Sequence, residues 1–287
     1  MKKILIIGKD SYIGNHIDDW LTARCFECTQ LDVLNDMWTS FDYSKYDAIV
    51  HVAGIVHRPN CQDWDLYKRV NVDMPVQIAS RAKEQGRCKV YVFFSSMAVY
   101  GIGKELKPTI IDDKSPLMAD SMYGKSKLMA EQELERLQSS SFNVVFVRPP
   151  SVYGKGCRGN YISGFASIVD RLPVFPVAYQ NVKQSMLYID NLCEFVRLAI
   201  EKNLKGAYCP QDDKSVCANE ILNSIAKSKG LKRANSVFLG LFVRAISFIP
   251  LIKKVYGGVE YSRSLSDDNG LNYVVVPFEE GMKRTIC

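Results

Sequence analysis

The chain of 287 residues has few of the side chains that build metal and disulfide sites, and they lack the spacing that such sites need. It has three histidines and nine cysteines, an odd number that fits no regular disulfide framework. Cys25 and Cys28 form a lone C-x-x-C pair, and no second pair or His-x-x-x-His completes a zinc site. On a strand, this odd spacing turns the two thiols to opposite faces, which argues against a redox pair. We therefore expect no metal, free thiols and a reducing, cytoplasmic location.

The chain also lacks a long hydrophobic run without charge. Its first apolar run, residues 4–7, is short and a glycine turn follows at once, so no signal peptide is expected. The most apolar window, residues 236–252, contains Arg244 and Pro250, which argue against a membrane-spanning helix. We expect a buried helix there. Shallow docking at a membrane stays open as an alternative, because two lysines follow at 253–254.

No internal repeat or low-complexity stretch is present, and the basic residues are dispersed. A net charge of +6 therefore indicates mild attraction to anionic metabolites and no nucleic-acid partner. With 47% hydrophobic residues, the chain can bury a large core in one large domain or two closely packed ones.

Short apolar runs alternate with helical patterns through the first two thirds of the chain. This β–α alternation predicts an α/β fold, a parallel sheet with helices on both faces. Ligands of such sheets bind beyond the carboxyl ends of the strands. The expected strands lie at 3–7, 26–31, 48–52, 90–95, 144–148 and 185–189, and the expected helices at 12–23, 66–85, 121–138, 162–171 and 191–202.

The first strand leads into a glycine turn and then a helix. The sequence Gly-Lys-Asp-Ser-Tyr-Ile-Gly places Gly8, Ser11 and Gly14 between them. Backbone N–H groups and the helix dipole at such a turn can hold a pyrophosphate. Ser11 stands where a third glycine is usual, and its hydroxyl and amide could both donate to a phosphate.

Further polar or small residues follow three other expected strands. They are His51-Val-Ala-Gly54, Ser95-Ser96 and Arg148-Pro-Pro-Ser151. Parallel strands bring these segments to the same edge of the sheet as Gly8, so we expect one cleft. His51 ends a buried strand, and we expect it to satisfy backbone groups rather than to transfer protons.

Tyr123 and Lys127 lie four residues apart at the start of an expected helix, and so share one face. An ammonium within ~4–6 Å favours the phenolate and lowers its pKa by about 1–3 units. Tyr123 would then suit proton abstraction from a sugar hydroxyl.

Together these motifs resemble the extended short-chain dehydrogenase/reductase superfamily, in its NAD-dependent sugar-nucleotide epimerase/dehydratase branch. The matching blocks are Gly8…Gly14, His51-Val-Ala-Gly54, Asn71-Val-Asp, Ser95-Ser-Met-Ala-Val-Tyr-Gly101, Tyr123-Gly-Lys-Ser-Lys127, Arg148-Pro-Pro-Ser-Val-Tyr-Gly154 and Tyr188-Ile-Asp190. The resemblance implies a Rossmann-type doubly wound parallel sheet with a smaller C-terminal substrate-binding lobe. It places a dinucleotide-binding domain at 1–152, continuing at about 185–202, and the lobe at 153–184 and 203–287.

The resemblance also implies roles for single residues. Tyr123 would be the catalytic base, Lys127 would bind the nicotinamide ribose, and Ser96 would hydrogen-bond the reacting sugar oxygen. Ser96 is preferred to Ser95 because it precedes Met-Ala-Val-Tyr. Asn71 would tie the sheet to a helix. The residues expected to bind the cofactor are Gly8, Ser11, Tyr12, Ile13, Gly14, Asp32, Ala53, Gly54, Tyr123, Lys127, Pro150 and Ser151.

The cofactor is expected to be NAD. Asp32 follows Gly8 at about the ~20-residue offset of a ribose-binding acid. NADP stays open, because Lys9 and Arg24 could hold a 2′-phosphate. The segment between the first helix and His51 is short for the family. Typical members have a second strand that ends in an acidic residue and then a further strand with its own aspartate. Here Asp32 could serve in either role, or the two strands could be merged into one.

The substrate is expected to be a nucleotide sugar. The residues expected to contact it are Ser96, Tyr123, Arg158, Asn160 and Arg263. The branch commonly dimerises through the helix that carries the catalytic tyrosine, and the apolar Leu128, Leu134 and Leu137 would permit a homodimer.

Three functions remain open. The Ser-Ser and Tyr-Gly-Lys-Ser-Lys blocks look closest to the UDP-glucose 4-epimerases, which indicates C4 epimerisation of a UDP-hexose through a transient 4-keto intermediate. A reductase of a nucleotide-linked 4-keto-6-deoxy sugar in surface polysaccharide synthesis is the alternative. A non-catalytic dinucleotide-binding subunit is the third. A dehydratase is disfavoured because Met97 and Ala98 stand where related dehydratases carry an Asp-Glu pair, and neither can transfer a proton.

Overall fold

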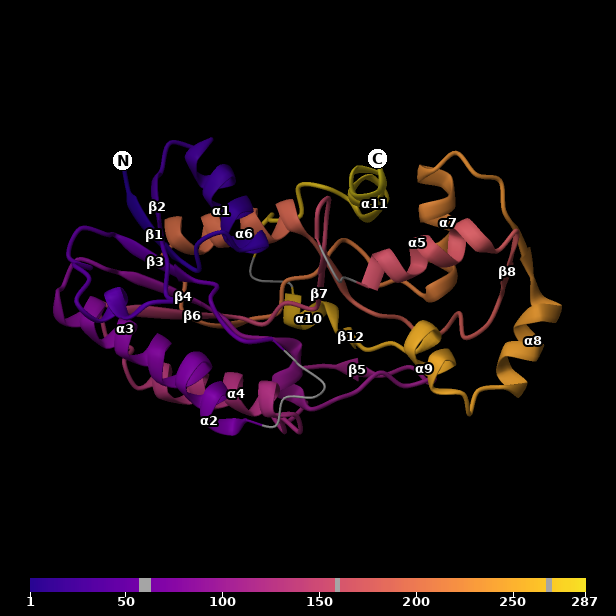
Figure 1. Cartoon of the computed structure of the whole chain (residues 1–287), viewed down its shortest axis with the longest axis horizontal. Helices are drawn as coiled ribbons and strands as arrows, with labels where there is room; N and C mark the ends of the chain where they lie inside the picture. Colours follow the sequence, from indigo (N-terminus) through magenta and orange to yellow (C-terminus); the bar gives the residue numbers. More distant parts are fainter. Residues whose placement is uncertain (57–62, 158–160, 267–269) are drawn as a thin grey trace.

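A parallel sheet of six strands forms the centre of one half of the molecule (Figure 1). The computed structural model describes residues 1–56, 63–157, 161–266 and 270–287. The sheet order is β2-β1-β3-β4-β6-β10, and every neighbouring pair is parallel. The strands are β1 (Lys3–Ile7), β2 (Glu27–Leu31), β3 (Ala48–His51), β4 (Val90–Phe94), β6 (Asn143–Val147) and β10 (Gly206–Tyr208). After β1 the chain adds β2 on one side of it and then crosses over to add β3 on the other side. The point where the strand order reverses therefore lies between β1 and β3.

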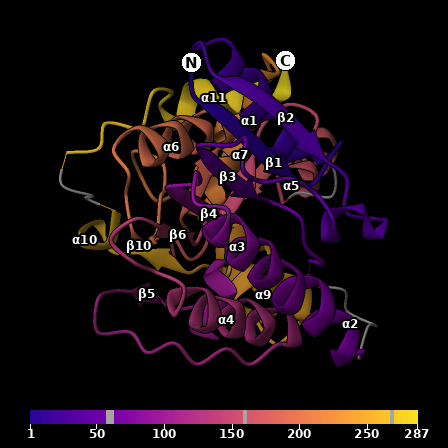
Figure 2. The ribbon, with the colours of Figure 1, turned by 90° about the vertical axis from the view of Figure 1, so that its left-hand side faces the viewer.

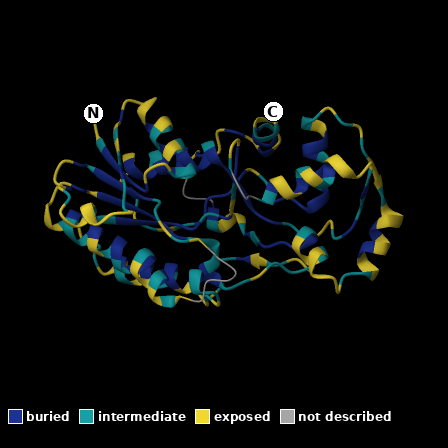
Figure 3. Cartoon of the chain, in the orientation of Figure 1, coloured by how far each residue is buried: buried dark blue, intermediate teal, exposed yellow. Residues whose placement is uncertain are grey.

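Helices cover both faces of this sheet. Figure 1 places α1 (Tyr12–Thr22) and α6 (Ile189–Glu201) above it, and α3 (Met74–Glu84) and α4 (Met122–Glu135) below it. Figure 2 shows the same layers from the end of the sheet. Successive side chains of a strand point to opposite faces, so Ile4 and Ile6 join the cluster under α1 and α6, whereas Leu5 and Ile7 join that under α3 and α4. The central strands are buried throughout (Figure 3), as the continuous apolar runs predict.

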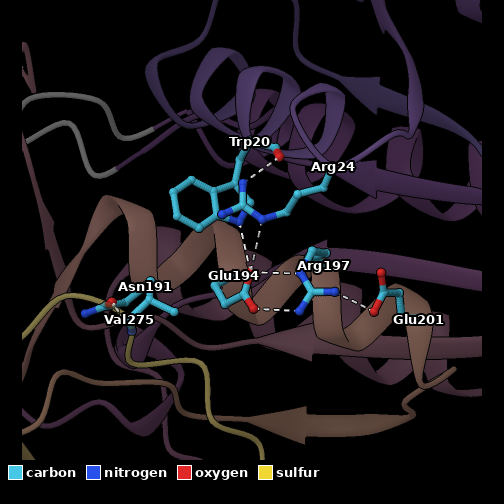
Figure 4. Close-up of polar contacts among 7 residues, drawn as sticks. All are labelled: Trp20, Arg24, Asn191, Glu194, Arg197, Glu201 and Val275. Atoms are coloured by element: carbon cyan, nitrogen blue, oxygen red, sulfur yellow. Dashed lines mark hydrogen bonds and ion pairs between the residues drawn. The ribbon is translucent and has the colours of Figure 1, made fainter.

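The α1–α6 pair is fixed by charged contacts (Figure 4). Glu194 of α6 accepts a hydrogen bond from the Trp20 indole at 3.0 Å and two bonds to its carboxylate from Arg197. The Arg24 guanidinium lies 3.6 Å from the centre of the Trp20 ring, and its Nε lies 3.8 Å from Glu194. Arg24 therefore faces α6. The prediction that it could hold a 2′-phosphate is wrong in this structure, because Glu194 and Trp20 already hold its guanidinium.

The remaining elements form the other end of the molecule and its junction with the sheet. Asn191 of α6 ties down the C-terminal segment, because its Oδ1 accepts from the amides of Val275 and Val276 at 2.9 Å (Figure 4). These elements are β5 (Ile110–Ile111), β7 (Ser151–Tyr153), α5 (Tyr161–Arg171), β8 (Val174–Pro176), β9 (Met186–Tyr188), α7 (Ala218–Ser228), β11 (Ala234–Ser236), α8 (Val237–Ala245), α9 (Pro250–Tyr256), β12 (Glu260–Tyr261), α10 (Arg263–Ser266) and α11 (Phe278–Ile286). The short helix α2 (Trp64–Lys68) instead packs beside α4, below the central sheet (Figure 1).

The α/β class and all six expected strands are confirmed, but the sixth expected strand does not belong to the central sheet. Residues 186–188 form β9, which pairs with β7 in a separate two-stranded sheet. The sixth strand of the central sheet is β10, which pairs with β6. Three-residue strands carry little periodicity, so only long-range pairing distinguishes them.

Two further expectations need correction. Leu134 was expected at a surface of α4 that permits dimerisation, but it is fully buried in the core beneath that helix. The apolar window 236–252 was expected to be a buried helix, but α8 exposes most of its side chains (Figure 3). Within the described residues, no helix is long and apolar enough to cross a membrane.

Candidate functional site

The turn after β1 requires glycine at its first position. Gly8 has φ +120°, and a Cβ there would lie 2.9 Å from Val52 Cγ2 and 3.0 Å from the Ala53 amide nitrogen. Val52 and Ala53 both donate their amides to the Ile7 carbonyl. The end of β3 and the turn after β1 are therefore in direct contact, at the reversal point of the sheet where ligands of such folds bind.

Ser11 caps the helix that follows. Its Oγ accepts a hydrogen bond from the Gly14 amide at 3.1 Å, so it is the N-cap of α1. Its amide donates to the Gly8 carbonyl at 3.3 Å. The expectation that this amide could serve a phosphate is therefore wrong, and the hydroxyl proton is the remaining donor. No described residue accepts from the amides of Tyr12 and Ile13, which point from the first turn of α1. These donors fit a pyrophosphate.

The side chain of Tyr12 has a packing role. A Cβ on Gly154 would lie 2.5 Å from the Tyr12 hydroxyl, so this residue must be glycine for the loop after β7 to approach the ring. Burial raises the pKa of Tyr12, and its hydroxyl has no hydrogen-bond partner among the described residues. The phenol therefore stays protonated, and Tyr12 offers its backbone to a ligand.

Asp32 lies directly after β2, at the edge of the sheet. Its Oδ1 accepts from the Leu34 amide at 2.8 Å, which leaves Oδ2 for a ligand. The amides of Gly8 and Lys9 donate to the Leu31 carbonyl at 3.0 and 3.3 Å, so the carboxylate adjoins the phosphate turn. In the described part of the chain no strand lies beyond β2, which accounts for the short segment seen in the sequence.

Gly54 brings the end of β3 against α4. A Cβ on Gly54 would lie 3.0 Å from Asn71 Oδ1 and 3.1 Å from Lys127 Nζ. Asn71 donates to the Ile55 carbonyl and to Ser126 Oγ, both at 2.9 Å, and accepts from the Ile55 amide. Asn71 thus ties the strand end to α4, as predicted.

Lys127 is buried behind this glycine. Its Nζ donates to the Phe94 carbonyl at 2.7 Å and lies 4.6 Å from the centre of the Phe93 ring. Burial lowers the pKa of Lys127 to about 7, and the nearby Glu131 opposes this shift.

Tyr123 lies one turn before Lys127 on α4 and faces Ser96. Burial raises the pKa of the Tyr123 phenol, hydrogen bonding to Ser96 lowers it, and the neighbouring Tyr67 raises it. The prediction of a lowered pKa is therefore wrong for this structure. The reason is that Lys127 directs its amine to the Phe94 carbonyl and is not among the groups that shift the phenol.

The two serines after β4 face different surroundings. Ser96 Oγ accepts from the Ala98 amide at 3.1 Å and caps the 3₁₀ helix Met97–Tyr100. Its hydroxyl proton can therefore point to Tyr123. Ser95 Oγ is buried without a partner among the described residues. The geometry thus brings Ser96, and not Ser95, to Tyr123.

Gly124 sets this arrangement, and the sequence reasoning overlooked it. A Cβ on Gly124 would lie 2.5 Å from the Ala98 carbonyl oxygen, so only glycine lets α4 pack this closely on the 3₁₀ helix. The adjacent Tyr123 is thereby held against Ser96. The signal was the glycine inside a helix, which costs stability and so indicates a packing reason.

The other expected site residues lie in different parts of the molecule. Pro150 is buried, and the exposed Ser151 begins β7 after β6. Arg263 donates to the Asp212 carbonyl at 2.7 Å, and no contact among the described residues joins it to Tyr123. Arg158 and Asn160 lie outside the described residues.

His51 has a structural role, but its partner is a side chain. Its Nδ1 lies 2.7 Å from the Tyr91 hydroxyl, which donates to the Pro75 carbonyl at 3.0 Å. Burial first, and then the Lys127 charge, lower the pKa of His51 to about 3, so it stays neutral.

Comparison with known proteins agrees with this geometry. The sequence model of the NAD dependent epimerase/dehydratase family matches residues 4–208. UDP-glucose 4-epimerase of Vibrio cholerae is 26% identical over 249 residues, 78% of this chain and 75% of that protein. N-acetyl-alpha-D-glucosaminyl-diphospho-ditrans,octacis-undecaprenol 4-epimerase of Escherichia coli O157:H7 is 30% identical over 222 residues, 71% of this chain and 65% of that protein.

A solved structure shares the fold over the whole chain. The crystal structure of the human epimerase family protein SDR39U1 with NADPH superposes with a TM-score of 0.77 at 17% identity, covering 99% of both chains. The family match spans both the phosphate turn and the Tyr123–Lys127 helix. The chain therefore belongs to the NAD dependent epimerase/dehydratase family, and is an enzyme whose cofactor is NAD or NADP.

Proposed function

We propose that this enzyme catalyses C4 epimerisation of a UDP-hexose through a transient 4-keto sugar. The observation that carries the proposal is that Tyr123 faces Ser96 and Lys127 packs on Gly54, at the end of the strand that contacts the Gly8 turn. A sugar hydroxyl next to Ser96 and Tyr123 would have both a hydrogen-bond donor and a proton acceptor.

The cofactor would lie along the strand ends of the 1–152 segment. The amides of Tyr12 and Ile13 with the Ser11 hydroxyl would hold its pyrophosphate, and Asp32 a ribose. Ala53 and Gly54 let the backbone approach it, while Pro150 and Ser151 would line the nicotinamide pocket. When bound, the oxidised nicotinamide would supply reversible acceptance of the C4 hydride, and its positive charge would favour the phenolate of Tyr123.

The protein residues then have separate tasks. Ser96 orients the O4 hydroxyl, Tyr123 removes its proton, and the buried Lys127 provides the ammonium near the ribose. Inversion at C4 would require the 4-keto sugar to turn in the site before the hydride returns to its other face, and Tyr123 would then return the proton to O4. Met97 and Ala98 offer no acid or base for loss of water, so the sequence supports epimerisation over dehydration.

The group that carries the sugar has to be determined by assay, because the two relatives differ in their named substrates. The purified enzyme, without added cofactor, should be incubated separately with UDP-glucose, UDP-galactose, their N-acetyl forms, and N-acetylglucosaminyl diphosphoundecaprenol. Interconversion of a UDP-linked C4 pair supports the proposal, whereas interconversion of the undecaprenol-linked sugar alone would contradict UDP as the carrier. No interconversion of any of these substrates would reject it.

A 4-keto reductase is the second candidate, and one observation favours it. The raised pKa of Tyr123 keeps the phenol protonated at neutral pH, which suits a proton donor. Steady oxidation of NADH or NADPH with a UDP- or dTDP-linked 4-keto-6-deoxy sugar would support this reaction. Turnover without net consumption of cofactor would exclude it in favour of the epimerase.

A further inference from the structure

Helix α8 attaches to the protein by a narrow face of small residues. Gly240 and Val243 are its buried residues. A Cβ on Gly240 would lie 2.6 Å from the Val177 carbonyl carbon, closer than van der Waals contact allows, so the helix backbone rests directly on the chain after β8. The opposite side of α8 is left uncovered by the described residues.

That uncovered side is apolar. Phe238, Leu241 and Phe242 follow the i, i+3, i+4 spacing that normally faces a core, yet they are 79%, 61% and 62% exposed. Past the helix end, Phe248 is also 80% exposed. Monomeric soluble proteins rarely leave a contiguous apolar patch of this kind without a partner. We call the following six residues the α8 surface: Val237, Phe238, Leu241, Phe242, Phe248 and Leu251.

Positive charge predominates in the chain segment that contains the α8 surface. Between Glu220 and Glu260 the chain has no acidic residue, so the basic residues are less dispersed than the composition suggests. Lys229 and Lys253 pair with Asp170 and Glu105 from other segments. Lys232 and Lys254 form no ion pair within the described part of the chain. The basic residues of this segment are Lys227, Lys229, Lys232, Arg233, Arg244, Lys253 and Lys254.

A hollow joins the charged and apolar parts. It is lined by Val237 and Leu241 of the α8 surface, by Arg244, and by the amide side chains of Gln180 and Asn181. The Arg244 guanidinium lies 4.7 Å from the centre of the Tyr179 ring, which holds it at this rim. Hydrogen-bond donors next to exposed phenylalanines match the boundary between lipid headgroups and acyl chains.

We propose that the α8 surface docks on the face of an anionic phospholipid bilayer, with its phenylalanines and leucines at the acyl boundary and its lysines and arginines among the headgroup phosphates. An apolar face in a segment that contains cations and no acidic residue fits this partner better than a second copy of the chain, whose α8 surface would bring the same charges together. Figure 1 places α8 at one end of the long axis, away from the central sheet, so the active site stays free when α8 is docked.

The test is co-sedimentation of the full chain with vesicles. Phosphatidylcholine vesicles and vesicles that also contain phosphatidylglycerol should be compared at low and high salt. We expect binding to the anionic vesicles that weakens with salt. Phe238→Ser/Phe242→Ser should weaken it by roughly tenfold or more, and Lys253→Gln/Lys254→Gln by roughly tenfold.

Leu34→Ser/Met37→Ser is the matched control, because both side chains are exposed and apolar but lie after β2. This variant should bind like the wild type. Equal binding to both vesicle types, no binding to either, or equal loss in the control would overturn the proposal. A lipid-free dimer that Phe238→Ser/Phe242→Ser dissociates would overturn it in favour of self-association. Vesicle binding is read without substrate, so its outcome is independent of the proposed epimerase reaction.

Discussion

The Lys127 ammonium donates a hydrogen bond of 2.7 Å to the carbonyl of Phe94, the last residue of β4. This bond joins α4, which carries Tyr123, to β4, which leads into Ser96. It also directs the lysine towards the backbone and Gly54, whereas Tyr123 faces Ser96.

Replacing Lys127 by methionine should change how stability depends on pH. Burial lowers the pKa of Lys127 to about 7 from 10.5, so between these values the unfolded chain binds more protons than the folded one. The wild type should therefore become more stable as pH rises from about 7 towards 10.5, and the burial penalty is full below about 7. Lys127→Met should lose this rise and be more stable at neutral pH by on the order of 4 kcal/mol.

The free energy of unfolding, measured with urea from pH 6.5 to 10 in steps of about 0.5 pH unit, would check this. Lys125→Met, on the exposed side of the same helix, is the control and should keep the wild-type profile. A wild-type stability that falls over the same range would contradict the buried lysine.

Gly124→Ala should impair catalysis through the position of α4. The added Cβ would lie 2.5 Å from the Ala98 carbonyl, so the helix must move away from the 3₁₀ helix that carries Ser96. We expect a loss of about 1–3 kcal/mol in stability and a lower kcat. In Gly164→Ala, on α5, the Cβ would meet nothing within 4 Å, and stability should stay equal or rise. Thermal unfolding and kcat of both variants would decide this. Equal effects of the two substitutions would contradict the packing argument.

Arg148→Met should destabilise the protein strongly. Arg148 Nε and Nη2 donate to the two carboxylate oxygens of Glu131 at 3.0 and 2.6 Å, and both side chains are largely buried. Removal of one partner leaves a buried charge and should cost about 3–5 kcal/mol. The double variant Glu131→Leu/Arg148→Met should cost less than Arg148→Met alone. Denaturant unfolding of the three proteins measures this, and a single variant as stable as wild type would refute it.

Asp32→Ser should change cofactor preference. Asp32 Oδ2 is the carboxylate oxygen left for a ribose, because Oδ1 accepts from the Leu34 amide. Loss of this acceptor should weaken NADH binding by about tenfold, while removal of the charge should strengthen NADPH binding beside Lys9. Fluorescence titration with both cofactors gives the ratio of the two dissociation constants. An unchanged ratio would mean that Asp32 does not read the ribose.

Local patterns carried much of the prediction. The strand expected at 3–7 has the bounds of β1, because its apolar run at 4–7 is the pattern of a buried parallel strand. Helix α1 begins at Tyr12, as expected, because Ser11 caps it. The place of Ser96 before Met-Ala-Val-Tyr was enough to prefer it to Ser95, and the structure brings Ser96 to Tyr123.

The parts that failed depend on contacts between distant segments. Residues 206–208 and 186–188 are both short apolar stretches, and only pairing with β6 or β7 tells their strands apart. The pKa of Tyr123 depends on burial and on where the lysine points, neither of which spacing along a helix contains. The outward side of α8 has the same periodicity as a core-facing helix, so the pattern predicted burial.

The most direct test of the central claim is Tyr123→Phe, measured for both turnover and cofactor binding. Tyr123 is assigned the proton transfer, whereas the turn at Gly8 and the carboxylate of Asp32 are assigned the dinucleotide. The account predicts that the variant binds NAD within about twofold of the wild type and loses roughly 10²–10⁴-fold in kcat with the sugar substrate. A variant that keeps its turnover, or that loses its cofactor along with its turnover, would contradict it.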